Sequence, residues 1–263
     1  MPRISIGDCS LHYETHGAGE PLLLVPGLGG VGASFFKQIP ELAKRYRVIV
    51  HDHRGCGQSD KPIMQYSVEQ MAQDVLRLMD GLEIGRAHLL GHSTGGAIGQ
   101  IIALEQPQRL NRLILSSTWT HGDAFFTRLF EARHALLKNL GPLGYIRGTT
   151  PNLYPGWWIA RNEKMITEQE EQQAAAFPPP EVMLSRIEAI MRFDRREQIP
   201  RIRTPTLVSV AADDSVTPPY FAQALAQAIP GAKLKVFPQG GHLLYHVVDK
   251  EYTAAVLEFL QGN

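Results

Sequence analysis

The chain has 263 residues, of which 44% are hydrophobic and 20% charged, which is enough for one large domain with a sizeable core. Its 26 basic and 26 acidic side chains give a formal net charge of +0, which argues against nucleic acid or an anionic membrane as a partner and favours a small molecule. No apolar run reaches the roughly 20 residues of a membrane-spanning helix. The sequence starts at Met-Pro-Arg without an apolar signal segment, and Cys9 and Cys56 lie far apart. These features predict a reduced, cytoplasmic protein.

The first half of the chain alternates short apolar runs with segments of helical period. Residues 3–16 alternate apolar and polar side chains around Gly7-Asp8, which predicts an antiparallel hairpin at one edge of a sheet. The apolar runs that follow do not alternate, as expected for strands buried on both faces; they are residues 22–25, 47–51, 88–91 and 112–116. Helical periodicity lies between them at residues 35–44, 68–82 and 97–105. This order predicts a mostly parallel sheet.

The second of these helices carries its own start signal. The Ser67 hydroxyl can accept a hydrogen bond from a free amide of the first turn, and the Gln70 side chain can return a bond to the Ser67 amide. This capping box places the start of the helix at residue 68.

The strand pattern stops near Thr120 and resumes after Arg203. The segment between has the pattern of helices interrupted at Gly141-Pro142 and at the proline-rich residues 151–155 and 178–180. Strand, helix, strand and helix then follow at residues 205–211, 220–229, 233–238 and 252–260. We therefore expect an α/β core of residues 1–119 and 204–263, with helices on both faces of the sheet, and a helical lid inserted at residues 120–203.

The motif Gly91-His92-Ser93-Thr94-Gly95-Gly96 lies between a predicted strand and a predicted helix. In that setting G-x-S-x-G is typical of a tight turn that presents its serine at the N-terminus of a helix, where free amides favour negative charge. The pattern alone is also compatible with a simple turn. The strand and helix around it favour Ser93 as a nucleophile.

A serine nucleophile requires a histidine base that is oriented by a carboxylate. In a fold of this kind the acid follows a late strand and the histidine lies in the last loop. Asp213 and Asp214 follow the predicted strand at residues 205–211, and we favour Asp214, although either could cap the next helix. His242 follows Gly240-Gly241 after the last strand, whereas the nearby His246 is expected to face the core or the lid.

An oxyanion hole needs two backbone amides, one after the nucleophile and one in the loop after an early strand. Pro26-Gly27-Leu28-Gly29-Gly30 follows the buried run at residues 22–25, and its glycines let the amides turn inward. We predict the amides of Leu28 and Thr94 as the two donors.

These motifs together resemble the α/β-hydrolase family over nearly the whole chain. Residues 52–59 resemble the family's D-x-R-G-x-G-x-S turn, residues 213–218 its acid loop, and residues 240–242 its histidine loop. Among small cofactor-free bacterial members, residues 213–219 resemble the 3-oxoadipate enol-lactonases and residues 153–158 the aminoacrylate hydrolases. The resemblance implies a serine hydrolase that needs no metal or cofactor and cleaves an ester, a lactone or a related acyl bond through an acyl-enzyme.

The substrate pocket is expected under the lid, where Trp157 and Trp158 are candidates, although both could equally anchor the lid. A carboxylate substrate would require an arginine, and Arg128, Arg133 and Arg161 are available, with Arg133 our choice. Two alternatives keep the same triad. One is a receptor-like protein with vestigial hydrolysis, and the other is a carbon–carbon bond hydrolase or cofactor-free perhydrolase.

Overall fold

The computed structural model describes residues 2–262 and contains an eight-stranded sheet in the order β1-β2-β4-β3-β5-β6-β7-β8. β1 and β2 form an antiparallel hairpin at one edge, β2 also pairs antiparallel with β4, and all other neighbouring strands are parallel. The strands are β1 (Arg3–Ser5), β2 (Ser10–His16), β3 (Glu20–Val25), β4 (Tyr46–His51), β5 (Ala87–His92), β6 (Leu110–Ser116), β7 (Thr206–Ala211) and β8 (Lys233–Phe237).

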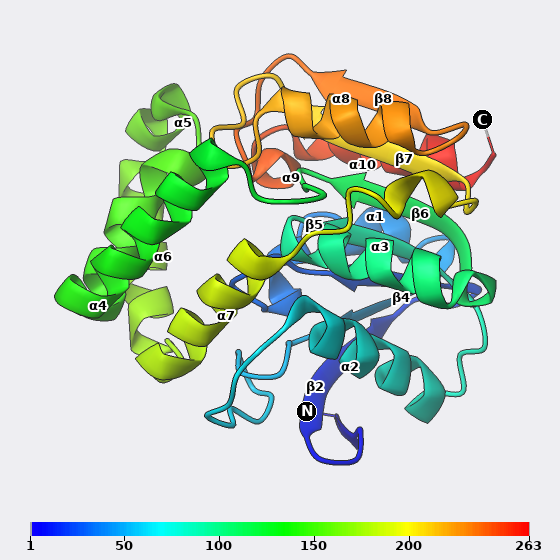
Figure 1. Cartoon of the computed structure of the whole chain (residues 1–263), viewed down its shortest axis with the longest axis horizontal. Coiled ribbons are helices and arrows are strands. Elements are labelled where there is room, and N and C mark those ends of the chain that lie inside the picture. The colour runs from blue at the N-terminus through cyan, green and yellow to red at the C-terminus, as the bar shows by residue number, and fades with distance from the viewer. Residues whose placement is uncertain (1, 263) are drawn as a thin grey trace.

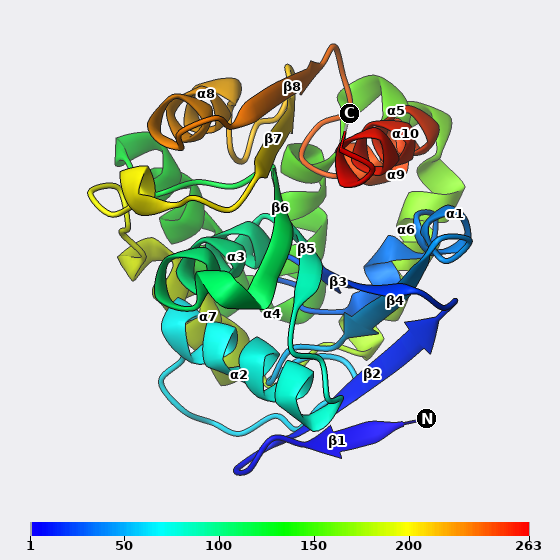
Figure 2. The same ribbon diagram turned by 90° about the vertical axis from the view of Figure 1, so that its right-hand side faces the viewer.

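Helices cover both faces of this sheet (Figure 2). One face carries α2 (Val68–Gly81), α3 (Thr94–Glu105) and α8 (Pro219–Ala228), and the other carries α1 (Ile39–Leu42), α9 (Leu244–Val247) and α10 (Asp249–Leu260). Successive side chains of β3 show why its apolar run does not alternate. Leu22 and Leu24 pack in one core cluster, whereas Leu23 and Val25 pack in the other. The predicted α/β fold class is confirmed.

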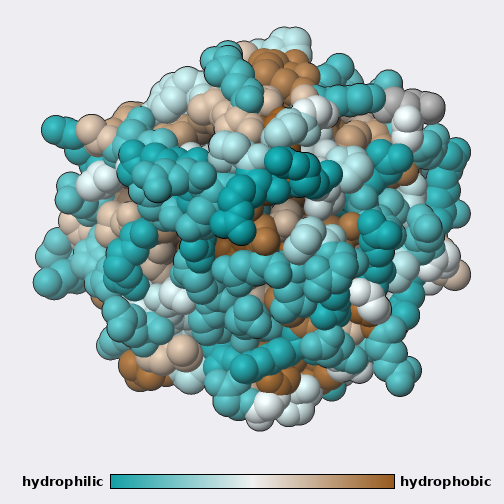
Figure 3. All heavy atoms as spheres, turned by 45° about the vertical axis from the view of Figure 1, so that its right-hand side comes forward, coloured by the Kyte–Doolittle hydropathy of each residue, from teal (hydrophilic) through white to brown (hydrophobic). Residues whose placement is uncertain are grey.

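A helical insertion lies between β6 and β7 and consists of α4 (Ala124–Leu153), α5 (Gly156–Arg161), α6 (Glu163–Ala175) and α7 (Pro180–Arg192). Figure 1 shows α7 between the core and the outer helices α4 and α6. Gly141 bends α4, with φ 68° and ψ −171°, at the predicted Gly141-Pro142 break. Within residues 2–262 no helix combines the length and the apolar character that crossing a membrane requires. The face drawn in Figure 3 is mostly hydrophilic, with small scattered hydrophobic patches.

Two local predictions were wrong. The helix expected at residues 35–44 is instead a 3-10 turn, Gly32–Phe35, followed by the short α1. Pro40 explains the break, because proline is tolerated in a first helical turn but not in a helix interior. At α2 the Ser67 hydroxyl does accept from the Gln70 amide at 3.0 Å, but the Gln70 side chain bonds Asp74 rather than returning to Ser67. Only half of the capping box forms, because the Gln70 Nε2 donates to the Asp74 carboxylate and the Gln70 Oε1 has no hydrogen-bond partner among the described residues.

Candidate active site

Ser93 lies in the tight turn between β5 and α3, with φ 54° and ψ −116°, a conformation that non-glycine residues rarely adopt. Its amide donates to the Ser116 carbonyl at 2.8 Å, and its carbonyl accepts from the Thr118 hydroxyl at 2.8 Å. A Cβ on Gly95 would overlap the carbonyl oxygen of Val25, so glycine is required for this close approach of α3 to β3. These contacts hold the serine at the N-terminus of α3.

The last two loops at the same end of the sheet bring an imidazole and a carboxylate to this serine. His242 Nε2 lies 3.1 Å from Ser93 Oγ, and His242 Nδ1 lies 3.1 and 3.0 Å from the two carboxylate oxygens of Asp214. All three residues are buried. The Nδ1 proton can therefore point to Asp214, which leaves the Nε2 lone pair free to accept the serine proton.

Asp214 is held in its charged form by its surroundings. Its Oδ1 accepts from the amides of Val216 and Thr217 at 2.9 Å each, and its Oδ2 accepts from the Thr217 hydroxyl at 3.0 Å. Burial by itself would raise the pKa of Asp214, but the charge of His242 and these hydrogen bonds outweigh it and hold the pKa below its ordinary value. Asp214 can therefore orient His242 and stabilise the imidazolium.

The neighbouring Asp213 has a different partner. Its Oδ1 accepts from the amide of Gly241 at 2.8 Å and so fixes the loop that carries His242. Of the two adjacent aspartates, only Asp214 contacts the imidazole among the described residues. Asp214 thus lies beside the His242 ring, whereas Asp213 bonds the backbone of the loop that carries it.

His246 is occupied elsewhere. Its Nε2 lies 2.7 Å from the Ser34 carbonyl, which can only accept, so Nε2 carries the proton. Its Nδ1 then accepts from the Tyr154 hydroxyl at 3.1 Å, at the end of α4. Burial lowers the pKa of His246, in agreement with a neutral ring. His246 was expected to face the core or the lid; it bonds a residue of each, and within the described residues it forms no hydrogen bond with Ser93.

The loop after β3 approaches the serine from the other side. A Cβ placed on Gly27 would lie 3.2 Å from the Cβ of Ser93, so the loop backbone runs directly past Ser93. The amide of Gly30 donates to the carbonyl of Gly27 at 3.0 Å and closes a turn that contains Leu28. The predicted oxyanion donors are both buried: Leu28 lies within this turn, and Thr94 is the first residue of α3.

The three predicted pocket residues have different environments. Trp157 is 38% exposed, and the guanidinium carbon of Arg161 lies 5.3 Å from its ring centroid. Trp158 stacks on Tyr154 at 4.5 Å, with an interplanar angle of 7°. Trp158 therefore packs on another side chain of the insertion, Tyr154, whose hydroxyl in turn bonds His246 of α9. Trp157 lies on the surface of α5.

Arg133 of α4 is buried and lies between two aromatic rings. Its guanidinium carbon is 4.9 Å from the ring centroid of Phe130 and 5.5 Å from that of Tyr145, and its Nη2 donates to the Tyr145 hydroxyl at 3.0 Å. Within the described residues its Nε has no hydrogen-bond partner, and no carboxylate forms an ion pair with it. The guanidinium thus retains hydrogen-bonding capacity inside the insertion.

The end of α4 also contacts both catalytic loops through its backbone. The carbonyl of Asn152 accepts from the Ser215 hydroxyl at 3.0 Å, next to Asp214. The carbonyl of Leu153 accepts from the Leu243 amide at 3.0 Å, next to His242. The insertion is therefore hydrogen-bonded to the acid loop and to the histidine loop.

Two buried polar side chains near this site were not singled out from the sequence. The His92 ring packs 4.9 Å from that of His242, and burial holds the pKa of His92 well below its ordinary value. Arg186 of α7 is fully buried and bonds the loop that contains Leu28. A signal for Arg186 was present, because it follows Val182 by four residues and precedes Ile190 by four, which places a charge on the apolar stripe of its helix.

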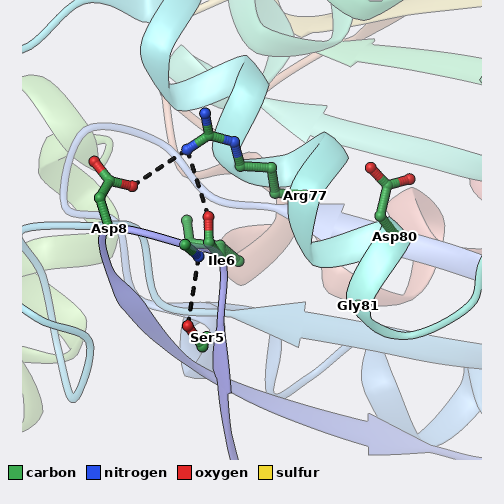
Figure 4. A pocket seen from close by; sticks show the side chains of 7 residues that line it. Ser5, Ile6, Asp8, Arg77, Asp80 and Gly81 are labelled. Atoms are coloured by element: carbon green, nitrogen blue, oxygen red, sulfur yellow. Dashed lines mark hydrogen bonds and ion pairs between the residues drawn. The ribbon is translucent and has the colours of Figure 1, made fainter.

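An open depression of about 520 Å³ lies elsewhere, between the β1–β2 turn and the end of α2 (Figure 4). Its cation, Arg77, lies 3.2 Å from Asp8, so the two charges compensate each other. None of the residues of the candidate site lines it. Within residues 2–262 no group of three or more His, Cys, Asp or Glu side chains is arranged to hold a metal ion.

Known proteins are similar to this chain over nearly its whole length. A family model described as alpha/beta hydrolase fold matches residues 20–247. A protein of Azorhizobium caulinodans that carries the provisional name carbamate hydrolase RutD is 41% identical, over 98% of each chain. The enol-lactonase from Burkholderia xenovorans LB400 superposes with a TM-score of 0.92 at 28% identity, over 99% of this chain and 100% of that chain. A hydrolase from Pseudomonas aeruginosa PA01 gives 0.90 at 31% identity, over 100% and 98%.

Proposed function

The chain belongs to the α/β-hydrolase family, and from that premise we propose that it is a serine hydrolase that cleaves an ester, a lactone or a related acyl bond of a small molecule. The observation that carries the proposal is the hydrogen-bonded series from Ser93 Oγ through His242 to Asp214. It supplies the base that a serine hydroxyl needs at neutral pH.

In the proposed mechanism His242 Nε2 takes the proton of Ser93 as Oγ attacks the substrate carbonyl carbon. The amides of Leu28 and Thr94 stabilise the negative charge that develops on the carbonyl oxygen. The imidazolium then protonates the leaving group, and an acyl-enzyme remains on Ser93. His242 next takes a proton from water, whose attack on the acyl carbon releases the acid product and restores the serine.

The names of two relatives support the proposed class of substrate. One is named for carbamate hydrolysis and another for the hydrolysis of an enol-lactone, and both names describe attack on a carbonyl that bears a heteroatom leaving group. The burial of Ser93 and His242 favours a small substrate. We propose that residues 120–203 act as a lid over a core of residues 1–119 and 204–263, with Trp157 and Trp158 at the edge of the pocket.

We propose in addition that Arg133 binds a carboxylate or another anionic group of the substrate. A buried guanidinium without an acidic partner is costly, and an anionic ligand would remove that cost. Arg128, also on α4, is exposed and bonds only the Ala124 carbonyl of its own helix among the described residues, which makes it a weaker candidate.

Arg133→Met is therefore expected to raise KM for an ester that carries a carboxylate, such as 4-nitrophenyl hemisuccinate, by about 10- to 100-fold, the range of one lost charge-assisted hydrogen bond. KM for the neutral 4-nitrophenyl butyrate should change little. Arg128→Met serves as the control for the loss of a positive charge from α4. An equal rise in KM for both esters in Arg133→Met would argue for a packing role instead.

The proposal as a whole is tested by mass spectrometry of the intact protein after treatment with a fluorophosphonate, which reacts with activated serines. We expect one adduct on the wild-type protein and none on Ser93→Ala, together with wild-type hydrolysis of short 4-nitrophenyl esters. An adduct without turnover would favour the receptor-like alternative, and product analysis separates acyl transfer to water from carbon–carbon bond cleavage and perhydrolysis. A folded wild-type protein with neither adduct nor turnover would refute the assignment.

A further inference from the structure

Arg186 is a charged side chain with 0% exposure, carried by α7 of the insertion but bonded to loops of the core. Its Nη1 donates to the carbonyl of Arg54 at 3.0 Å, and its Nη2 donates to the carbonyl of Leu28 and to His53 Nδ1, both at 3.1 Å. One guanidinium thus joins α7 to the loop after β3 and to the loop after β4.

The charge of Arg186 lacks the compensation that a buried ion normally has. Among the described residues no carboxylate oxygen forms an ion pair with it within 4.0 Å, and its Nε has no hydrogen-bond partner. Arg54, which is also buried, shows the usual arrangement, because it binds the carboxylates of Asp74 and Asp8 at 2.8 to 2.9 Å. Burying a guanidinium without a carboxylate partner is energetically unfavourable. Packing alone does not explain why a charged side chain occupies this position.

The bond to the Leu28 carbonyl fixes one of the two peptide planes next to the Leu28 Cα. The other plane, between Gly27 and Leu28, is fixed by the 3.0 Å bond from the Gly30 amide to the Gly27 carbonyl. In a trans peptide the N–H points opposite to the carbonyl, so the Leu28 N–H points away from the interior of this turn. With both planes held from their carbonyl sides, the direction of the Leu28 N–H is determined.

We propose that Arg186 is a positioning residue for the oxyanion hole, which keeps the Leu28 amide aimed at the developing oxyanion without touching the substrate. This inference rests on the proposed serine-hydrolase function and deepens it. α7 then does more than cover the site, because it supplies the group that orients one of the two oxyanion donors. Loss of the guanidinium should weaken binding of the transition state and leave binding of the uncharged ester largely unchanged.

The test compares Arg186→Met, which removes the charge and the donors, with Arg186→Lys, which keeps the charge but carries its donors on one nitrogen instead of the two that Arg186 uses. With 4-nitrophenyl acetate we expect kcat to fall by about 10- to 100-fold in the Met variant and less in the Lys variant, with KM within about threefold of wild type; a complete loss of one oxyanion donor costs about 10²- to 10³-fold. The second-order rate of fluorophosphonate addition to Ser93 should fall in parallel. Urea unfolding shows whether each variant is folded.

Arg192→Met is the matched control. Arg192 lies on the same helix and its Nη2 donates to the Tyr66 carbonyl at 3.0 Å, so it too joins α7 to the core, but within residues 2–262 it forms no hydrogen bond with the Leu28 loop. Its kcat should stay within about twofold of wild type. Folded Met and Lys variants with wild-type kcat and labelling rates would overturn the proposal, and if the Met variant does not fold, a wild-type kcat in the Lys variant overturns it. Failure of the underlying function is distinguishable, because the wild-type protein would then give no adduct.

Discussion

Ser93→Ala and His242→Ala are each expected to lower kcat for ester hydrolysis by about 10⁶-fold, and the double variant should be no slower than either single variant. The reason lies in the 3.1 Å contact between Ser93 Oγ and His242 Nε2, since the nucleophile and its base act as one unit. In a variant that lacks either Ser93 or His242, the remaining residue no longer contributes to catalysis, so its loss has no further effect. Steady-state rates for the three variants, measured against the uncatalysed reaction, check this prediction.

His246→Ala is the informative comparison for the base. His246 bonds the Ser34 carbonyl and the Tyr154 hydroxyl and lies outside the series that contains Ser93. A loss of kcat as large as that of His242→Ala would show that the wrong histidine has been assigned as base. Additive losses in the Ser93/His242 double variant would likewise contradict a shared catalytic role.

Asp214→Asn is expected to lower kcat by about 10⁴-fold while KM stays nearly constant. An asparagine amide directed at His242 Nδ1 would force the other tautomer, in which Nε2 carries a proton and cannot accept one from Ser93. The hydrogen bonds from Val216 and Thr217 to Oδ1 favour this outcome, because they require an acceptor at that position and leave the amide nitrogen to face the imidazole. Steady-state kinetics and a pH profile of kcat/KM measure the effect.

Asp213→Asn provides the matched control one residue away. Its remaining carbonyl oxygen can still accept the 2.8 Å hydrogen bond from the Gly241 amide, so the histidine loop should keep its position. We expect less than about a tenfold change in kcat, since no tautomer depends on this side chain. Comparable losses in the two variants would mean that the carboxylates share the orienting role.

Much of the fold could be predicted from the sequence because both faces of the parallel strands are buried, as Leu22 to Val25 illustrate. Such runs are short, apolar and separated by helical segments, so their order along the chain is visible. The turn at Ser93 was recognisable for the same reason, since its glycines lie between a strand and a helix. The prediction of one helix at residues 35–44 was wrong, because Pro40 interrupts the segment despite its apolar periodicity.

The surroundings of the candidate site were much harder to predict. Asp213 and Asp214 are adjacent in the chain, and only their side-chain directions distinguish them. Trp157 and Trp158 were grouped together, although one stacks on Tyr154 and the other is exposed on α5. Arg186 reaches Leu28 across 158 residues of sequence, and no local pattern encodes that contact. Long-range hydrogen bonds of this kind depend on tertiary packing rather than on periodicity.

The three contacts of the insertion with the catalytic loops differ in how they constrain evolutionary divergence. The contacts to the acid loop and the histidine loop use the main-chain carbonyls of Asn152 and Leu153, which any residue supplies as long as α4 ends along the same path. The contact to the Leu28 loop uses the side chain of Arg186, which few residues could replace. Of these three contacts, only the one to the Leu28 loop constrains the identity of a side chain in the insertion. A chimera that exchanges this segment between relatives must preserve the backbone path at the end of α4 and one arginine on α7.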